Sequence, residues 1–179
     1  MQTEKIVFAL LACALLAGLA FLALDAMPKR PVAFFAYGAA LAKSAVNARA
    51  GGFINATAAD LPGFGLVFAS QDARPTEFGV ATLVQNESSS VKGALYYLTP
   101  EQMAFLDKQS GAPDFYERKM VKVVLPDGSG ADAQAYFLAG SVHPAAPSRP
   151  YYLAAQGGMH EWGYDTSGLD AAVAAISPN

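Results

Sequence analysis

The chain begins with a long apolar run. Residues 6–24, IVFALLACALLAGLAFLAL, contain no charged side chain. A helix of this length rises roughly 30 Å, which matches the hydrocarbon core of a bilayer. A cleaved signal peptide is the alternative, because the run is N-terminal and follows Lys5. The run is longer than a usual signal core and no small-x-small cleavage site follows it. We therefore expect a tail over residues 1–5, a transmembrane helix over 6–24 and a linker over 25–31.

After this run, the pattern becomes one of mixed strands and helices. Residues 32–37 are apolar and predict a buried strand, and residues 40–50 predict a helix that ends at a pair of glycines. The sequence TPEQ over 99–102 is a capping box with proline at the first helical position, so it predicts a helix over 100–110. The remaining predictions are strands over 65–69, 79–85, 91–98, 116–125 and 133–139, a hairpin connection over 87–90, and helices over 151–156 and 169–176.

Composition and charge limit the partners. Hydrophobic residues make up 53% of the 179 residues and the formal charge is −3, which suits one compact domain over 32–179 beside the apolar run. No basic run marks a nucleic-acid surface, so we expect no nucleic-acid partner. The single cysteine, Cys13, lies in the apolar run. His160 and Glu161 are adjacent but lack the spacing of metal ligands, so we expect no metal and no cofactor.

Basic residues flank the apolar run unevenly. Lys29 and Arg30 follow it closely, whereas Lys5 precedes it. The positive-inside rule therefore favours a single-pass protein of the cell membrane whose C-terminal domain faces the cytoplasm, although short tails often keep the N-terminus inside instead. Ala14 and Gly18 are four residues apart, and such small side chains let transmembrane helices approach closely. They favour docking onto a larger membrane protein complex; a plain anchor in the bilayer is the alternative.

A series of short motifs follows along the rest of the chain. FAYGAAL occupies residues 35–41 and LDKQSG residues 106–111. The others are GVATL over 79–83, VKGALY over 91–96, YER over 116–118, YFL over 136–138 and PSRPY over 147–151. In this order they resemble the gamma-glutamylcyclotransferase family (AIG2-like fold), whose own motifs include FAYGSNL and LDxxEG. The resemblance covers residues 33–176.

The resemblance implies an α+β fold: a small mixed-sheet barrel with flanking helices, in which the signature loop and the glutamate of LDxxEG face each other across a cavity. It also implies an activity, the release of 5-oxoproline from gamma-glutamyl compounds. In that reaction the glutamate takes a proton from the substrate's α-ammonium, so that the amine can attack its own γ-carbonyl.

Two parts of that site differ here. Ser110 stands at the position of the glutamate, and Ala39 and Ala40 stand at those of the signature's serine and asparagine. A serine hydroxyl is not a useful base without a neighbouring histidine, and nothing in the sequence places His143 or His160 beside Ser110. We therefore expect a catalytically degenerate member of the family.

The signature loop is still able to bind an anion through its backbone. The loop of Tyr37, Gly38, Ala39, Ala40 and Leu41 retains backbone N–H groups near a helix N-terminus, which favours anions. It is expected either to hold a small carboxylate or, alternatively, only to form a tight turn that glycine permits.

The candidates for a substitute base are Asp107, which shares a helix face with Ser110, and Glu117 on the following strand. Structural roles are the alternative for both carboxylates. Tyr116 and Tyr151 fall on cavity positions of the family.

Three function classes remain. We favour a membrane-anchored, non-catalytic accessory or structural subunit of a membrane protein complex. The second class is an active cyclotransferase on a gamma-glutamyl amine or peptide that uses Asp107 or Glu117. The third is a sensor that binds a small acid.

Overall fold

The computed structural model describes residues 30–176. The apolar span predicted over residues 6–24 lies outside these residues, as do the tail and most of the linker. Within residues 30–176, no helix is long and apolar enough to cross a membrane.

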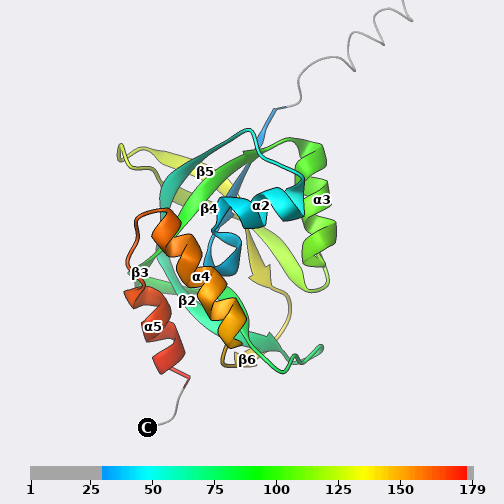
Figure 1. The fold of residues 1–179 in the computed structure, drawn as a ribbon, viewed down its shortest axis with the longest axis vertical. Helices are drawn as coiled ribbons and strands as arrows, with labels where there is room; N and C mark the ends of the chain where they lie inside the picture. Colours follow the sequence, from blue (N-terminus) through cyan, green and yellow to red (C-terminus); the bar gives the residue numbers. More distant parts are fainter. Residues whose placement is uncertain (1–29, 177–179) are drawn as a thin grey trace, which may run out of the picture. The chain divides into compact units, whose positions relative to one another are not determined.

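The described chain is built on a sheet that closes on itself (Figure 1). Neighbouring strands follow the order β3-β1-β5-β4-β2, and β2 also pairs with β3, so the ring is complete; β6 extends it beyond β2. The β1–β5 pair is parallel and the other pairs are antiparallel, which confirms the mixed-sheet barrel. The strands are β1 (Val32–Ala36), β2 (Asn55–Gln71), β3 (Val80–Leu98), β4 (Tyr116–Val124), β5 (Gly130–Leu138) and β6 (Val142–Pro144).

Helices flank the barrel. They are the short 3-10 helix η1 (Gly38–Ala40), α2 (Lys43–Ala50), α3 (Pro100–Ser110), α4 (Arg149–Glu161) and α5 (Ser167–Ala174). The capping box of α3 is formed as predicted: the Gln102 amide donates to Thr99 Oγ1 at 3.2 Å, and the Thr99 amide donates to Gln102 Oε1 at 2.9 Å. The helix then ends at Gly111, whose backbone is left-handed. Glycine adopts this conformation without strain.

Three predicted helices differ in their bounds. Helix α5 spans Ser167–Ala174 in place of the predicted 169–176. The segment 40–50 is interrupted, because the backbone of Ala42 is extended and α2 begins only at Lys43. The Lys43 amide donates to the Glu161 carboxylate at 3.3 Å and 3.4 Å, so a distant residue satisfies this helix start. Helix α4 is longer than the predicted 151–156, since the Ser148 side chain caps it at the N-terminus.

The predicted connection over 87–90 was wrong, because the strands predicted over 79–85 and 91–98 belong to one strand, β3. The strand predicted over 65–69 is part of the longer β2. Strands β2 and β3 form one long pair, and the register shifts between Pro62 and Phe64, whose partners are Ser90 and Gln85. Residues 86–89 therefore bulge out opposite Gly63. Pro62 and Gly63 are local breakers and the serines are turn formers, but cross-strand pairing on both sides of the bulge overrides these local preferences.

Strand β1 approaches β3 very closely at Gly93. A Cβ atom added there would lie 2.4 Å from Cζ of Phe35 and 2.6 Å from the carbonyl oxygen of Ala36. Phe35 is fully buried, and its ring occupies the space that a side chain at position 93 would need. Glycine at this position therefore allows the first strand to close the barrel.

We predict that Gly93→Ala lowers the free energy of unfolding by about 1–3 kcal/mol, because the added methyl overpacks the core against Phe35. Urea denaturation measures this change. Gly157→Ala is the control, since a Cβ there meets no described atom within 4 Å, and alanine in a helix gains up to about 1 kcal/mol over glycine. Equal stability of both variants would contradict the close approach.

Candidate ligand cavity

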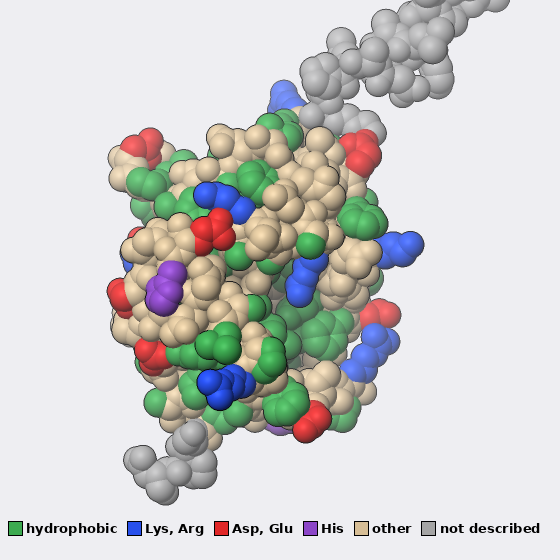
Figure 2. All heavy atoms as spheres, in the orientation of Figure 1, with side chains coloured by type: hydrophobic (Ala, Val, Ile, Leu, Met, Phe, Trp, Pro, Cys, Tyr) green, Lys and Arg blue, Asp and Glu red, His purple; other side chains and the backbone are tan. Residues whose placement is uncertain are grey.

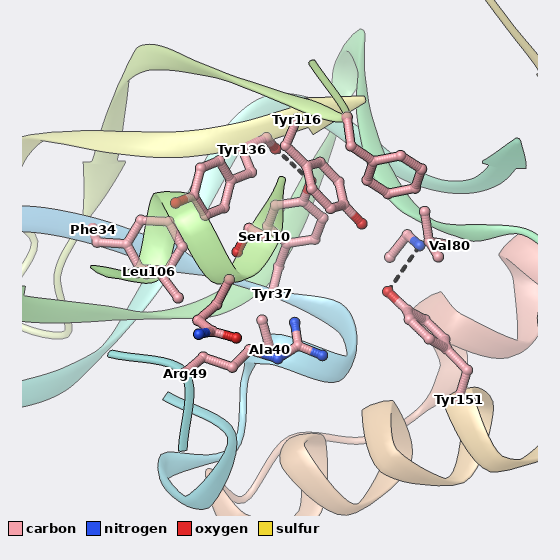
Figure 3. A pocket seen from close by; sticks show the side chains of 13 residues that line it. Phe34, Tyr37, Ala40, Arg49, Val80, Leu106, Ser110, Tyr116, Tyr136 and Tyr151 are labelled. Atoms are coloured by element: carbon pink, nitrogen blue, oxygen red, sulfur yellow. Dashed lines mark hydrogen bonds between the residues drawn. The ribbon is translucent and has the colours of Figure 1, made fainter. Parts of the chain in front are cut away.

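A cavity of about 440 Å³ lies where η1, α3, β4 and the start of α4 meet (Figure 3). The face of the molecule that carries α2, α3 and α4 is hollowed near its middle, and its basic and acidic side chains are interspersed (Figure 2). The cavity is lined by Phe34, Tyr37, Ala40, Arg49, Val80, Ala81, Leu106, Gln109, Ser110, Phe115, Tyr116, Tyr136 and Tyr151.

Five residues singled out in the sequence meet in this cavity. They are Tyr37, Ala40, Ser110, Tyr116 and Tyr151. Leu41, in contrast, is fully buried behind the loop. Its carbonyl oxygen accepts bonds from the Tyr96 hydroxyl at 2.8 Å and from the Trp162 indole at 3.1 Å. The opening loop is therefore anchored to the barrel and to the end of α4.

The opening loop is a tight turn. Gly38 has φ +58°, and a Cβ there would lie 2.7 Å from the Cβ of Ala81, so both its backbone and its packing require glycine. The Ala40 amide donates to the Tyr37 carbonyl at 3.2 Å. The Leu41 amide likewise donates to the Gly38 carbonyl at 3.1 Å. Two N–H groups of the loop are thus used within the turn itself.

Tyr151 lies against this loop. Its hydroxyl accepts a hydrogen bond from the Ala81 amide at 3.0 Å. Burial raises the pKa of Tyr151, and hydrogen bonds from the backbone of Ala81 and Ala39 oppose that rise. The Tyr151 oxygen therefore accepts from backbone N–H groups, and its own O–H remains available to donate to another group.

Ser110 is the last residue of α3 and takes part in a chain of side chains. Burial raises the pKa of Tyr136 most, its bond to Asp107 adds to this, and a hydrogen bond to Ser110 opposes it. The Tyr136 hydroxyl donates to Asp107 Oδ1 at 2.7 Å. The same oxygen pairs with Arg118 Nε at 3.2 Å. Asp107 is thus engaged behind the cavity wall and is absent from the lining.

Glu117 does not reach the cavity lining either. It lies on β4, where its carboxylate forms an ion pair with Lys119 at 2.7 Å. The two substitute bases considered from the sequence are therefore both paired with cations outside the lining.

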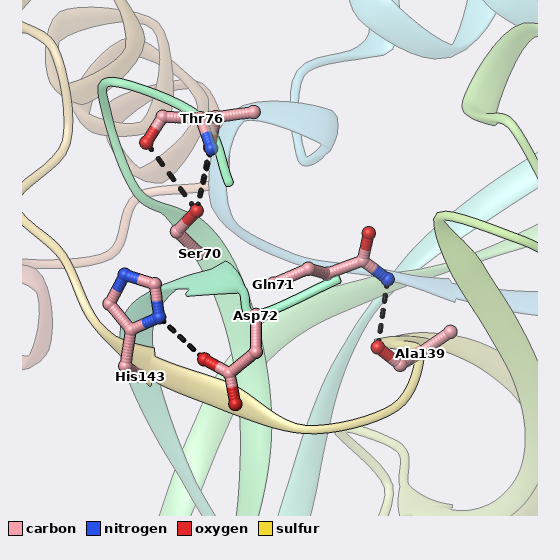
Figure 4. Close-up of polar contacts among 6 residues, drawn as sticks. All are labelled: Ser70, Gln71, Asp72, Thr76, Ala139 and His143. Carbon is pink, nitrogen blue, oxygen red and sulfur yellow. Dashed lines mark hydrogen bonds and ion pairs between the residues drawn. The ribbon is translucent and has the colours of Figure 1, made fainter. Parts of the chain in front are cut away.

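The histidines lie elsewhere. His143 Nδ1 lies 2.7 Å from Asp72 Oδ1, at the edge formed by β2 and β6 (Figure 4). His160 is exposed on α4. Its neighbour Glu161 binds the start of α2 and pairs with Lys43 Nζ at 3.7 Å. Among residues 30–176, no group of three or more His, Cys, Asp or Glu side chains could hold a metal ion.

Arg49 is the charged residue of the lining, and the sequence did not single it out. It lies in the last turn of α2. Burial raises the pKa of Tyr116 and of Tyr151, and Tyr151 adds to the rise at Tyr116. The positive charge of Arg49 opposes both rises. In Figure 3, Arg49 and Tyr116 enter the cavity from different sides. Its sequence signal was its place on the helix that directly follows the signature loop.

The chain matches the family model described as gamma-glutamyl cyclotransferase, AIG2-like, over residues 34–155. A structure described as a gamma-glutamyl cyclotransferase is similar, with 25% identity, a TM-score of 0.70, and coverage of 83% of this chain and 89% of that one.

An uncharacterized protein from Homo sapiens is equally similar, with 25% identity, a TM-score of 0.70, and coverage of 84% and 90%. YkqA from Bacillus subtilis shares the fold, with 19% identity, a TM-score of 0.69, and coverage of 84% and 57%. No curated protein sequence matches.

The raised pKa values predict alkaline instability. Burial raises the pKa of Tyr96 from 10.0 to about 12, and it also raises the pKa of Tyr37 and Tyr116. The unfolded chain therefore loses these protons at a lower pH than the native one. The contribution of Tyr96 to stability is complete below pH 10 and is lost as the pH rises towards 12. The contributions of Tyr37 and Tyr116 also begin to be lost above pH 10. Urea denaturation at several pH values measures this; full tyrosinate absorbance of the native protein near pH 10 would contradict it.

Proposed function

The chain belongs to the gamma-glutamyl cyclotransferase, AIG2-like family, and from this premise we propose that it is a non-catalytic member that binds a small carboxylate in the family's cavity. The observation that carries the proposal is the lining itself: the cavity has about 440 Å³ of space, and its lining includes no Asp, Glu or His. The site therefore has room for a ligand but lacks an ordinary proton acceptor.

The missing acceptor matters because of the reaction that the resemblance implies. Cyclisation needs a group that takes a proton from the substrate's α-ammonium before the nitrogen attacks the γ-carbonyl. A base for this step must be deprotonated near neutral pH and within hydrogen-bond reach. The Ser110 hydroxyl is far too weak an acid to be deprotonated, Arg49 is already a cation, and burial raises the pKa of Tyr37 and Tyr136.

The substitute carboxylates do not supply this base. Asp107 Oδ1 accepts the Tyr136 proton and pairs with Arg118, and Glu117 pairs with Lys119. Each carboxylate forms an ion pair with a cation, and neither belongs to the lining. These contacts favour structural roles for both residues.

Binding without turnover is what the remaining groups support. Arg49 provides a positive charge, and the hydroxyls of Tyr116 and Tyr151 provide neutral donors. A cation with several donors in a half-enclosed cavity suits a carboxylate, since charge-assisted hydrogen bonds are stronger than neutral ones.

The membrane role belongs to the same proposal and rests on the sequence. The uncharged run over residues 6–24, followed by Lys29 and Arg30, supports a single-pass anchor in the cell membrane with the domain on the cytoplasmic side. In this arrangement the domain is an accessory subunit of a larger membrane protein complex, which it contacts through its span.

We predict that the full-length chain in mild detergent releases no 5-oxoproline from gamma-glutamyl amines or peptides, and that Ser110→Glu gains measurable release. The variant restores a carboxylate at the end of α3, where the cavity lining places residue 110. Chromatographic detection of 5-oxoproline measures both.

Ser110→Gln is the matched control, because it has nearly the same shape as the glutamate variant but cannot accept the proton. Release by the unmodified chain would overturn the non-catalytic assignment. Equal release by the glutamate and glutamine variants would show that the introduced group does not act as a base.

A further inference from the structure

The polar side chains that line the cavity include several hydrogen-bond donors and no negatively charged acceptor. Arg49 contributes a guanidinium, and among residues 30–176 it forms no ion pair. Within the same residues, no partner is found for the Tyr116 hydroxyl. The Tyr151 oxygen accepts from Ala81, so its proton is free to be donated. The amide of Gln109 can also donate. A ligand that matches these groups presents a carboxylate.

The same cavity is unfavourable for a cationic group. A γ-glutamyl substrate carries an α-ammonium, which needs a carboxylate or several carbonyl oxygens to replace its water. No acidic side chain lines the cavity, and Asp107 is already neutralised by Arg118 at 3.2 Å. An ammonium there would lose hydration and be repelled by Arg49, and both effects disfavour binding.

One wall of the cavity is a row of aromatic rings. Phe34 and Tyr136 meet edge to face with centroids 5.2 Å apart. Tyr136 and Tyr116 are 5.6 Å apart, and Tyr116 and Phe115 meet edge to face at 4.9 Å. Rings from β1, β5, β4 and the residue before β4 thus form a continuous apolar surface. Such a wall favours a flat or aromatic ligand body, because rings pack well edge to face and offset.

We propose that the ligand is a small aromatic monocarboxylate without a charged amine, and that Arg49 holds its carboxylate. This inference rests on the proposed function, which supplies a binding cavity without turnover, and it names the chemical class of the ligand. Arg49 and the aromatic row provide the two ends: the guanidinium pairs with the carboxylate, and the rings of Tyr116 and Tyr136 contact the body. A volume of about 440 Å³ falls in the usual range for small-molecule sites.

Three probes of nearly equal size separate the chemical features. They are 3-phenylpropanoate, which has the carboxylate and no amine; phenylalanine, which adds the α-ammonium; and 3-phenylpropanamide, which lacks the charge. Isothermal titration of the full-length chain in mild detergent gives the Kd of each. We expect 3-phenylpropanoate to bind at least roughly tenfold more tightly than either of the others, the factor given by one charge-assisted contact.

Variants test where the carboxylate lies. Arg49→Gln should weaken 3-phenylpropanoate binding by roughly tenfold or more and leave 3-phenylpropanamide binding unchanged, because only the charged contact is lost. Arg49→Lys keeps the charge and should retain part of the affinity. Tyr116→Phe keeps the ring, removes one donor and should weaken binding a few-fold. Arg149→Gln is the control: it removes the same charge from an exposed arginine outside the cavity lining and should leave every Kd unchanged.

The outcomes are separable from those of the proposed function. Tighter binding of phenylalanine than of 3-phenylpropanoate would overturn the inference while leaving the non-catalytic assignment intact. Equal binding of 3-phenylpropanoate by the unmodified chain and Arg49→Gln, or no binding of it at all, would also overturn it. Release of 5-oxoproline by the unmodified chain would instead overturn the proposed function, whatever the probes do.

Discussion

The position of β1 between β3 and β5 is the constraint on which the rest of the structure depends. β1 pairs antiparallel with β3 along its whole length and parallel with β5 through Phe34 and Gln134. Glycine at position 93 makes room for the Phe35 ring at the first of these contacts. Since the loop Tyr37–Leu41 leaves directly from the end of β1, the packing of this strand determines where the cavity begins.

The turn after β1 is then held from three directions. The Tyr37 hydroxyl donates to the Tyr136 carbonyl on β5 at 2.5 Å, and the Leu41 carbonyl accepts from Tyr96 on β3 and from Trp162 after α4. These bonds are buried or half-buried, so breaking one of them would leave an unsatisfied polar group. The cavity wall near the loop is therefore rigid by construction. A ligand that binds there meets groups whose positions do not depend on it.

The sequence predicted the parts of this arrangement that are local. The capping box of α3 and the strand-to-turn signature depend on near neighbours. The family motifs singled out Ser110, Tyr116 and Tyr151, and these three residues line one cavity. The long β2–β3 pair was missed because Pro62 and Gly63 are strand breakers by local propensity. Cross-strand pairing on both sides of them overrides that propensity, and the local sequence does not contain this pairing.

Arg49 was missed for a similar reason. Its approach to the cavity depends on how α2 packs beside α3, and its place after the signature loop does not determine that packing. The aromatic row was also hidden, since Phe34, Tyr116 and Tyr136 come from strands far apart in the chain. Barrel closure brings them together.

The loss of the family glutamate can be weighed against the persistence of the cavity. Protein interiors are close-packed, and a hollow forfeits dispersion contacts on every wall. If the barrel served only as a structural block, a larger side chain at Ala40 would fill part of the space and add stability. Instead alanine lines it at this position, and Arg49 brings a charge to it. An unfilled cavity and a charged side chain in it both lower the stability of a purely structural domain. They are, however, the two features that an anion-binding site requires.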